Sequence, residues 1–359
     1  MKIKVPSSEM NRMMKTITQC IDQKSQDRSC VQVIYDNNLL TLRATNGLFS
    51  AVMSTPLLGG DGETFCVDGT MLARVCNMCS GEIEITTDGK TCTVKGAGRT
   101  RLPIVEAVIP AFEPVTGIEF AVKSDEFAKA YSNVACAISS DESRPVLTGI
   151  MMECSADPQY EYVRMTTLDG FRMAVESIPA TGAMSEAKIV VPGAFAKMVA
   201  ACSNFAEQFT IRTDGHQFSV SADGMLVKCT LLSGEFPDCT RILPTEFKTE
   251  CLVNVSQLRD ALKSGSVVNS SNNLIKMEVG ATKLTVMSNS EQADFDADIP
   301  CSTQGAELSI AFNHKYLMEI IGSVGTDDVV MKFNSNISPC VMQGKNADGI
   351  RLILPVRTR

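Results

Sequence analysis

The sequence predicts an α+β protein of three similar domains, each made of two β-α-β-β-β halves. The first observation is a repeated opening, in which a short apolar strand leads into a helix that begins near Ser7, Ser124 and Ser256. The second is a repeated middle, where another strand runs into another helix at 64–79, 187–203 and 307–324. The spacing of roughly 120 residues is far longer than a solenoid repeat and matches the size of a domain.

The elements of the first repeat illustrate the pattern. A helix from Ser7 to about Gln23 is followed by three stretches in which apolar and polar residues alternate, as in half-buried strands. In the second half Asp68 is the expected N-cap of a helix. Read through the whole chain, the pattern predicts six helices, at 7–24, 69–80, 124–139, 192–204, 255–266 and 313–322. One helix per strand-rich half implies sheets on one side and paired helices on the other.

Domain boundaries are expected in two proline-containing segments, 112–120 and 241–250. They divide the chain into domains at 1–117, 118–246 and 247–359. Each is large enough to bury its own hydrophobic core.

Composition excludes several classes of protein. With 44% hydrophobic and 21% charged residues, the chain resembles an ordinary globular protein. It has no run of 18 apolar residues and no apolar segment typical of a signal peptide near its start, so a cytoplasmic location is expected. Its 14 cysteines are then expected to be reduced and buried. The net charge of −8 argues against binding to nucleic acid by charge alone.

No catalytic constellation is evident. The two histidines, His216 and His314, have no credible partners in sequence, which makes a histidine-based metal or acid–base site improbable. Cys76 and Cys79 form a C-x-x-C motif, and a thiol enzyme built on them is one alternative, although packing inside a helix explains them more simply. We expect no enzyme, no cofactor and no bound metal.

Five phrases carry a resemblance to a known family, in the right order and at the right spacing. They are RPVLTGIMME (144–153), TLDGFRMAV (167–175), SGEFPDCTRILP (233–244), FNHKYLMEII (312–321) and RLILPVR (351–357). Together with the threefold layout, they make the whole chain resemble the bacterial sliding clamps, the beta subunits of DNA polymerase III.

The resemblance implies a head-to-tail homodimer that closes into a ring of six domains, with helices lining the hole and sheets outside. Such a ring encircles duplex DNA without regard to sequence and tethers the replicative polymerase. Because retention is topological, a few basic side chains at the lining are enough. The candidates for DNA contact are Lys15, Lys24, Arg28, Arg74, Lys197, Arg259 and Lys263, for which an ordinary surface role is equally open.

The resemblance also implies a groove that captures short linear motifs of polymerases, the clamp loader and repair proteins. Its wall would comprise Leu147, Leu168, Gly170, Phe171, Arg172, Met173, Pro237, Arg241, Ile242, Leu352, Leu354, Pro355, Val356 and Arg357. For Leu147, Met173, Ile242 and Leu354 a place in the core is equally open. Phe171 stands where the family often has histidine, and the chain continues to Thr358 and Arg359, so the motif preference is expected to differ.

The seam between subunits is expected where the first domain of one chain meets the third domain of the other. The residues carried over are Arg99, Arg101, Leu102, Ile104, Val267, Val268, Asp294, Asp296 and Asp298. Unpaired edge strands favour association, and opposite charges fix their register. Two alternatives stay open: a charge cluster with no partner, and a clamp-like peptide-binding scaffold that does not close on DNA.

Overall fold

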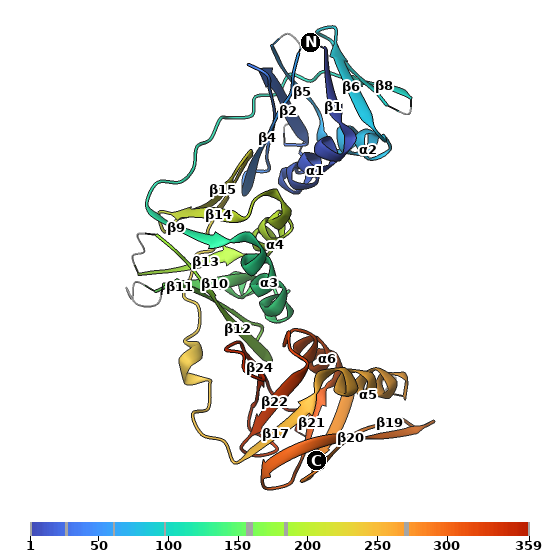
Figure 1. Cartoon of the computed structure of the whole chain (residues 1–359), viewed down its shortest axis with the longest axis vertical. Coiled ribbons are helices and arrows are strands. Elements are labelled where there is room, and N and C mark those ends of the chain that lie inside the picture. Colours follow the sequence, from blue (N-terminus) through green and yellow to red (C-terminus); the bar gives the residue numbers. More distant parts are fainter. Residues whose placement is uncertain are drawn as a thin grey trace. The chain divides into compact units, whose positions relative to one another are not determined.

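The computed structural model describes residues 2–25, 28–59, 62–96, 98–155, 161–182, 186–268 and 273–357. It contains two compact units, coloured along the chain in Figure 1. Unit 1 comprises Met1–Ala128, Ala180–Ser185 and Ala194–Leu231, and unit 2 comprises Lys129–Pro179, Glu186–Gly193 and Leu232–Arg359. Among the described helices, none is long and apolar enough to cross a membrane.

Unit 1 holds two antiparallel sheets. One contains β1 (Lys2–Pro6), β6 (Glu82–Thr87), β7 (Thr91–Lys95) and β8 (Arg99–Pro103), in that order. The other contains β2 (Cys30–Asp36), β3 (Leu39–Thr45), β4 (Phe49–Pro56), β5 (Glu63–Asp68), β9 (Ile118–Lys123), β14 (Gln208–Thr213), β15 (Gln217–Ala222) and β16 (Met225–Thr230). Its order is β5-β2-β3-β4-β16-β15-β14-β9, so the β4–β16 pair joins strands of the first and second sequence repeats.

The helices of unit 1 pack on its sheets through apolar faces. They are α1 (Ser7–Ile17), α2 (Gly69–Asn77) and α4 (Gly193–Ala200), followed by the short 3-10 turns η1 (Thr18–Cys20) and η4 (Ser203–Phe205). In Figure 1, α1 and α2 lie side by side. Met10, Met13 and Ile17 of α1 are fully buried, which fits helical spacing of apolar residues.

Unit 2 is built on a single antiparallel sheet of twelve strands. They are β10 (Gly149–Cys154), β11 (Tyr162–Leu168), β12 (Arg172–Pro179), β13 (Ala187–Pro192), β17 (Thr249–Asn254), β18 (Leu274–Val279), β19 (Lys283–Asn289), β20 (Asp294–Gly305), β21 (Leu308–Asn313), β22 (Asp328–Phe333), β23 (Cys340–Gly344) and β24 (Ile350–Ile353). The order is β13-β10-β11-β12-β24-β23-β22-β17-β20-β19-β18-β21, so β12–β24 joins the second repeat to the third.

The helices of unit 2 cover one face of this sheet. They are α5 (Val255–Val268), α6 (His314–Gly322) and the greater part of α3 (Ser124–Val134), with the 3-10 turn η2 (Ala135–Ala137). Two further 3-10 turns, η3 (Pro145–Thr148) and η5 (Cys239–Arg241), contribute to a cluster on the other face. Figure 1 shows α5 and α6 side by side on the strands of the third repeat. Their buried faces, for example Leu262 and Ile320, pack with strand residues such as Val253, Met277 and Phe333 in one core.

All six predicted helices are present, and the α+β layering is confirmed. Asp68 caps α2 as predicted, because its side chain accepts a hydrogen bond from the Met71 N–H. Three predicted helix ends are wrong by several residues. The segments after α1, α3 and α4 continue as 3-10 turns rather than α-helix, a common way to satisfy the last backbone groups of a helix.

A buried arginine fastens the β12–β24 pair from the helix side of the sheet. The side chain of Arg351 is 1% exposed, and its Nη2 lies 2.5 Å from Glu176 Oε1. The guanidinium also donates to Ser323 Oγ (2.9 Å), Ser323 O (2.7 Å) and Val175 O (3.0 Å). A buried charge held by several partners is tolerated, but it becomes costly when a partner is lost.

We predict that Arg351→Met strongly destabilises unit 2, because it removes a buried cation from its partners and leaves the half-buried Glu176 carboxylate without its counter-charge. The expected loss is about 3–5 kcal/mol, measured as a lower urea midpoint by circular dichroism. The matched control is Lys4→Met, which breaks the exposed Lys4–Glu82 pair (57% and 59% exposed) and should cost less than about 1 kcal/mol. Equal midpoints for the two variants would contradict the role given to Arg351.

Candidate functional site

The site forms where β12 pairs with β24. The register places Arg172 opposite Ile353 and Met173 opposite Leu352. Because side chains alternate along a strand, Met173 and Leu352 point to one face of the sheet while Ile353 points to the helix side. Two phrases almost 180 residues apart in sequence therefore share one surface.

A tight turn before β12 is held by a single carboxylate. Asp169 Oδ1 accepts hydrogen bonds from the N–H groups of Phe171 (2.9 Å) and Arg172 (2.8 Å). Gly170 has φ +90°, a conformation that side chains with a Cβ rarely adopt, which explains the glycine. The turn presents the Phe171 ring to solvent, 56% exposed.

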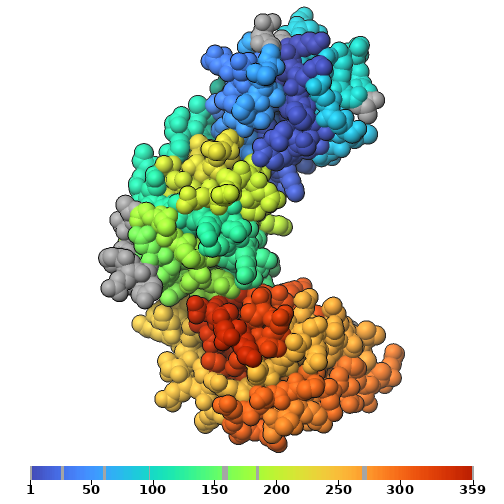
Figure 2. All heavy atoms as spheres, viewed as in Figure 1, coloured from blue at the N-terminus to red at the C-terminus, as the bar shows by residue number. Residues whose placement is uncertain are grey.

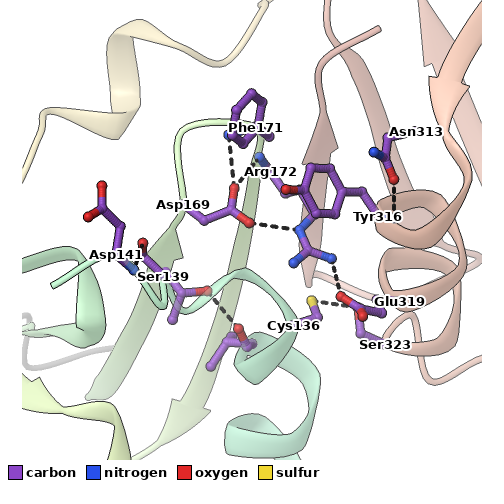
Figure 3. A network of polar contacts seen from close by, with 12 residues as sticks. Cys136, Ser139, Asp141, Asp169, Phe171, Arg172, Asn313, Tyr316, Glu319 and Ser323 are labelled. Atoms are coloured by element: carbon purple, nitrogen blue, oxygen red, sulfur yellow. Dashed lines mark hydrogen bonds and ion pairs between the residues drawn. The ribbon is translucent and has the colours of Figure 1, made fainter. Parts of the chain in front are cut away.

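Arg172 occupies the centre of a polar network, seen in Figure 3. Its Nε donates to Asp169 Oδ2 (2.9 Å), its Nη1 donates to Glu319 Oε2 (2.5 Å), and its guanidinium carbon lies 4.3 Å from the centre of the Tyr316 ring. Burial alone lowers the pKa of Arg172, but the hydrogen bonds and charges of Glu319 and Asp169 outweigh it and raise the pKa above its usual value. The side chain is thus a fixed cation.

The chain after β24 continues this surface. Leu354 N–H donates to Phe171 O (2.9 Å), and Val356 N–H donates to Ala311 O (2.8 Å). The Phe171 ring lies 5.5 Å from the Tyr316 ring, centre to centre. With Leu354 38% and Val356 39% exposed, an apolar strip remains open to solvent. Figure 2 shows the last part of the third repeat, coloured red, on the visible surface of unit 2.

A separate apolar cluster, distinct from the helix-side core, lies on the face of the sheet to which Met173 and Leu352 point. Its buried members are Leu147, Met151, Leu168, Met173, Val190, Phe236, Cys239, Val341 and Leu352. Partly buried residues pack against it: Val146, Val175, Leu232, Ile242, Leu243, Phe247 and Ile350. Segments from η3, β11, β12, β24 and the 232–247 linker thus converge.

The structure brings most of the predicted groove residues together. Leu147, Leu168, Met173, Ile242 and Leu352 belong to the cluster, and Phe171, Leu354 and Val356 to the exposed strip. Met173 (0% exposed) and Leu352 (1%) are fully covered, so they form a floor rather than an open wall. Pro237, Arg241 and Arg357 are exposed, and Pro355 is half-buried. Thr358 and Arg359 lie outside the described residues.

Sequence reasoning missed several residues of the site. Tyr316 and Glu319 come from α6 and hold Arg172, while Phe236 and Cys239 lie beside the predicted Pro237. Asp169, the carboxylate of the turn, was missed as well. The signal was present, because all five residues fall inside the phrases that carry the family resemblance.

The basic side chains predicted to face DNA are all exposed. Lys15, Arg74 and Lys197 lie on α1, α2 and α4, and Arg259 and Lys263 lie on α5. Lys24 and Arg28 lie in the segment before β2, where Arg28 donates to Asn46 O (3.1 Å). Two exposed lysines were missed, Lys129 on α3 and Lys315 on α6, so each of the six helices carries an exposed cation.

The predicted seam residues lie on β8 and just after it, on β20, and at the end of α5; β8 and the first part of β20 each have one unpaired edge among the described residues. Arg99 and Arg101 are exposed on β8, whose neighbour in its sheet is β7, whereas Leu102 points into the core of unit 1 (4% exposed) and Ile104 is half-buried. On β20, Asp294, Asp296 and Asp298 are exposed, and Asp298 already pairs with Lys283 (3.0 Å). Val267 at the end of α5 is 84% exposed, and Val268 is half-buried.

The thiol alternative loses support. Cys76 is fully buried, and burial raises its pKa to about 12, the opposite of an activated nucleophile. No disulfide occurs among the described residues, and most cysteines are buried. The same part of the chain holds no cluster of three residues suited to bind a metal ion.

Comparison with known families matches two thirds of the chain. The model for the DNA polymerase III beta subunit, central domain, matches residues 121–238, and the model for its C-terminal domain matches residues 240–357.

Individual proteins agree with the family models. The chain is 26% identical over 260 residues to a beta sliding clamp of Staphylococcus aureus, covering 70% of this chain and 67% of that protein. It is 25% identical over 289 residues to a beta sliding clamp of Staphylococcus epidermidis, covering 77% and 75%.

Solved structures share the fold over the whole length. The DNA polymerase III beta subunit of Thermotoga maritima superposes with a TM-score of 0.91 at 21% identity, covering 100% of both chains. A sliding clamp of Pseudomonas aeruginosa, solved bound to griselimycin, gives a TM-score of 0.92 at 19% identity, again covering 100% of both chains.

Proposed function

The chain belongs to the DNA polymerase III beta subunit family, and we propose on that premise that two copies close into a ring around duplex DNA. As a sliding clamp, the ring tethers the replicative polymerase and other partners through short motifs. The family acts as a non-catalytic processivity factor, and we propose that this chain likewise catalyses nothing. Work on replicating DNA would place it in the cytoplasm.

The ring proposal rests on how the repeats are joined. Successive repeats are joined by an antiparallel strand pair, here called a joint; the chain contains two such joints and two unpaired strand edges that could form a third. β4–β16 and β12–β24 join successive repeats by antiparallel pairing. Among the described residues, β8 pairs only with β7, so its other edge is free. The first part of β20, up to Pro300, pairs only with β19, so its other edge is free as well. Repeating one joint at both free edges closes a ring from two chains.

The three-domain division supports the same assembly. We propose domains at 1–117, 118–246 and 247–359, each contributing a pair of helices. The matched family models, 121–238 and 240–357, fit the last two of these segments.

We propose that DNA contacts separate exposed Lys and Arg side chains on the helices, and not one continuous basic patch. With a net charge of −8, the chain is a poor electrostatic binder, and topology supplies the hold. We assign the contact to Lys15, Lys24, Arg28, Arg74, Lys197, Arg259 and Lys263, with Lys129 and Lys315 added from the structure.

Partner motifs would bind the exposed strip above the buried cluster. Phe171, Leu354 and Val356 offer apolar surface beside a fixed cation, Arg172, which suits an extended segment with apolar anchors. The covered residues Met173 and Leu352 give this strip a firm floor. A ligand that enters deeper would have to displace part of the covering chain.

We predict that the protein, loaded by a cognate loader with ATP, stays on nicked circular plasmid and is lost after linearisation, because its hold is topological. Gel filtration of the loaded DNA measures retention. Equal retention on both forms would indicate ordinary binding. Failure to stay on either form, with peptide binding intact, would favour the scaffold that does not close on DNA.

We predict that Arg99→Glu with Arg101→Glu shifts the dimer toward monomer in sedimentation velocity, because the substitutions face acidic residues of the partner. High salt should also shift the wild-type protein from dimer toward monomer, because it screens the charges at the seam. Asp298→Ala serves as the control with little effect, since Asp298 is already paired with Lys283. A double mutant that remains dimeric at low micromolar concentration would remove these arginines from the seam.

We predict that a Gln-Leu-x-Leu-Phe peptide, the kind of motif the resemblance implies, binds in the micromolar range, about −8 kcal/mol. Phe171→Ala with Leu354→Ala should weaken it by roughly tenfold or more, as each change removes exposed apolar contact without opening a cavity. Leu48→Ala, at an exposed site in unit 1 (67%), is the control. Unchanged affinity in the folded double variant, measured by calorimetry, would place the groove elsewhere.

A further inference from the structure

The turn before the joint strand (β4, β12 or β20) has the same form in all three repeats, and this form also precedes β7, β15 and β23 in the second half of each repeat. In each case one side-chain oxygen accepts the N–H groups two and three residues further on. Asn46 Oδ1 binds Leu48 N (3.0 Å) and Phe49 N (2.8 Å), as Asp169 binds Phe171 and Arg172. Ser290 Oγ accepts from Gln292 N (3.3 Å) and Ala293 N (3.2 Å). The strands β4, β12 and β20 therefore start from equivalent turns.

This equivalence aligns the three strands residue by residue. The first position after each turn is the cross-strand partner of the last residue of the preceding strand. That position is occupied by Ser50 (opposite Thr45), Met173 (opposite Leu168) and Asp294 (opposite Asn289). Two residues further on, on the same face, stand Val52, Val175 and Asp296.

The strands on the other side of the joint align in the same way. Leu102, Cys229 and Ile353 are equivalent, since each pairs with the corresponding residue of the strand before it: Cys92, Phe218 and Cys340. An independent bond supports the alignment of the first two: Ile104 N donates to Lys90 O, and its equivalent Leu231 N donates to His216 O, both at 2.9 Å. Arg101 of β8 thus corresponds to Lys228 and Leu352.

Both joints within the chain use one register under this alignment. Ser50 faces Lys228, and Met173 faces Leu352. Two residues away, Val52 faces Leu226, and Val175 faces Ile350.

We propose that the seam between two copies repeats this register, with Arg101 opposite the partner's Asp294 and Arg99 opposite the partner's Asp296. The proposal rests on the dimeric ring proposed above and specifies how it closes. Arg99 and Arg101 are exposed on one face of β8, as Asp294 and Asp296 are on β20, so all four side chains lie on the same side of the joined sheet. Asp298 falls beyond the pair of arginines and keeps its own partner, Lys283.

Under this register the seam has one backbone hydrogen bond fewer than each of the two joints within the chain. Thr230 N donates to Leu48 O (3.3 Å), and Leu354 N donates to Phe171 O (2.9 Å). The equivalent residue of β8 is Pro103, which has no N–H. The partner's Gln292 carbonyl therefore receives no bond from this strand. Exposed ion pairs take the place of the buried apolar pair Met173–Leu352, so the seam is the joint most easily opened.

Charge exchange at matched positions tests the register. In sedimentation equilibrium, Arg101→Glu should raise the dimer dissociation constant by roughly tenfold or more, because it sets two acidic groups opposite each other. Adding Asp294→Lys to that variant should restore dimerisation to within about threefold of wild type, and adding Asp296→Lys instead should restore it much less. Restoration by Asp296→Lys alone, or equally by both, would overturn the register.

A second variant tests the missing hydrogen bond. Pro103→Ala supplies an N–H at the seam and should tighten the dimer by roughly threefold to tenfold, whereas Pro56→Ala, at the end of β4, should leave it unchanged. A Pro103→Ala dimer no tighter than wild type would overturn this part of the proposal. If the wild-type protein is monomeric throughout, the ring itself fails, an outcome distinct from a dimer that ignores the matched exchanges.

Discussion

The antiparallel pairing of β12 with β24 is the contact on which the rest of unit 2 depends. It extends the strands of one repeat into those of the next, so twelve strands form one sheet. On the helix side, Arg351 fastens the pair to Glu176 and Ser323. On the other side, the same pair places Met173 beside Leu352 and sets the turn of Phe171 against Leu354. Fold and candidate groove thus share one origin.

The same kind of strand pairing has different properties at each joint, because the outer face of the sheet carries different side chains there. At β12–β24 that face is apolar and covered, which creates the cluster and its exposed strip. At β4–β16 it carries Ser50 and Lys228, with the lysine 5.4 Å from the ring of Phe112 in the linker. At the free edges it carries arginines and aspartates. One backbone geometry therefore carries an apolar face at one joint, a polar face at another and, at the proposed seam, a charged face.

Sequence patterns predicted the helices, the Asp68 cap and the layering, because these depend on local periodicity and capping. They did not predict that α1 would end at Ile17, and they left open whether Met173 lines the groove or lies in the core, since both depend on tertiary packing. The groove residues came from the family resemblance, and Tyr316 and Glu319 escaped because nothing local links α6 to Arg172. The proposed register of β8 against β20 rests on the strand pairing and turns of all three repeats, which the sequence alone does not show.

Closure of two chains into a ring is the central claim, and direct imaging of the purified protein tests it best. Single-particle electron microscopy at micromolar concentration should show closed rings of two 38.7 kDa chains. Each ring should contain six similar domains around a hole wide enough for a DNA duplex. Isolated open arcs of three domains, at concentrations where the fold is intact, would contradict the account.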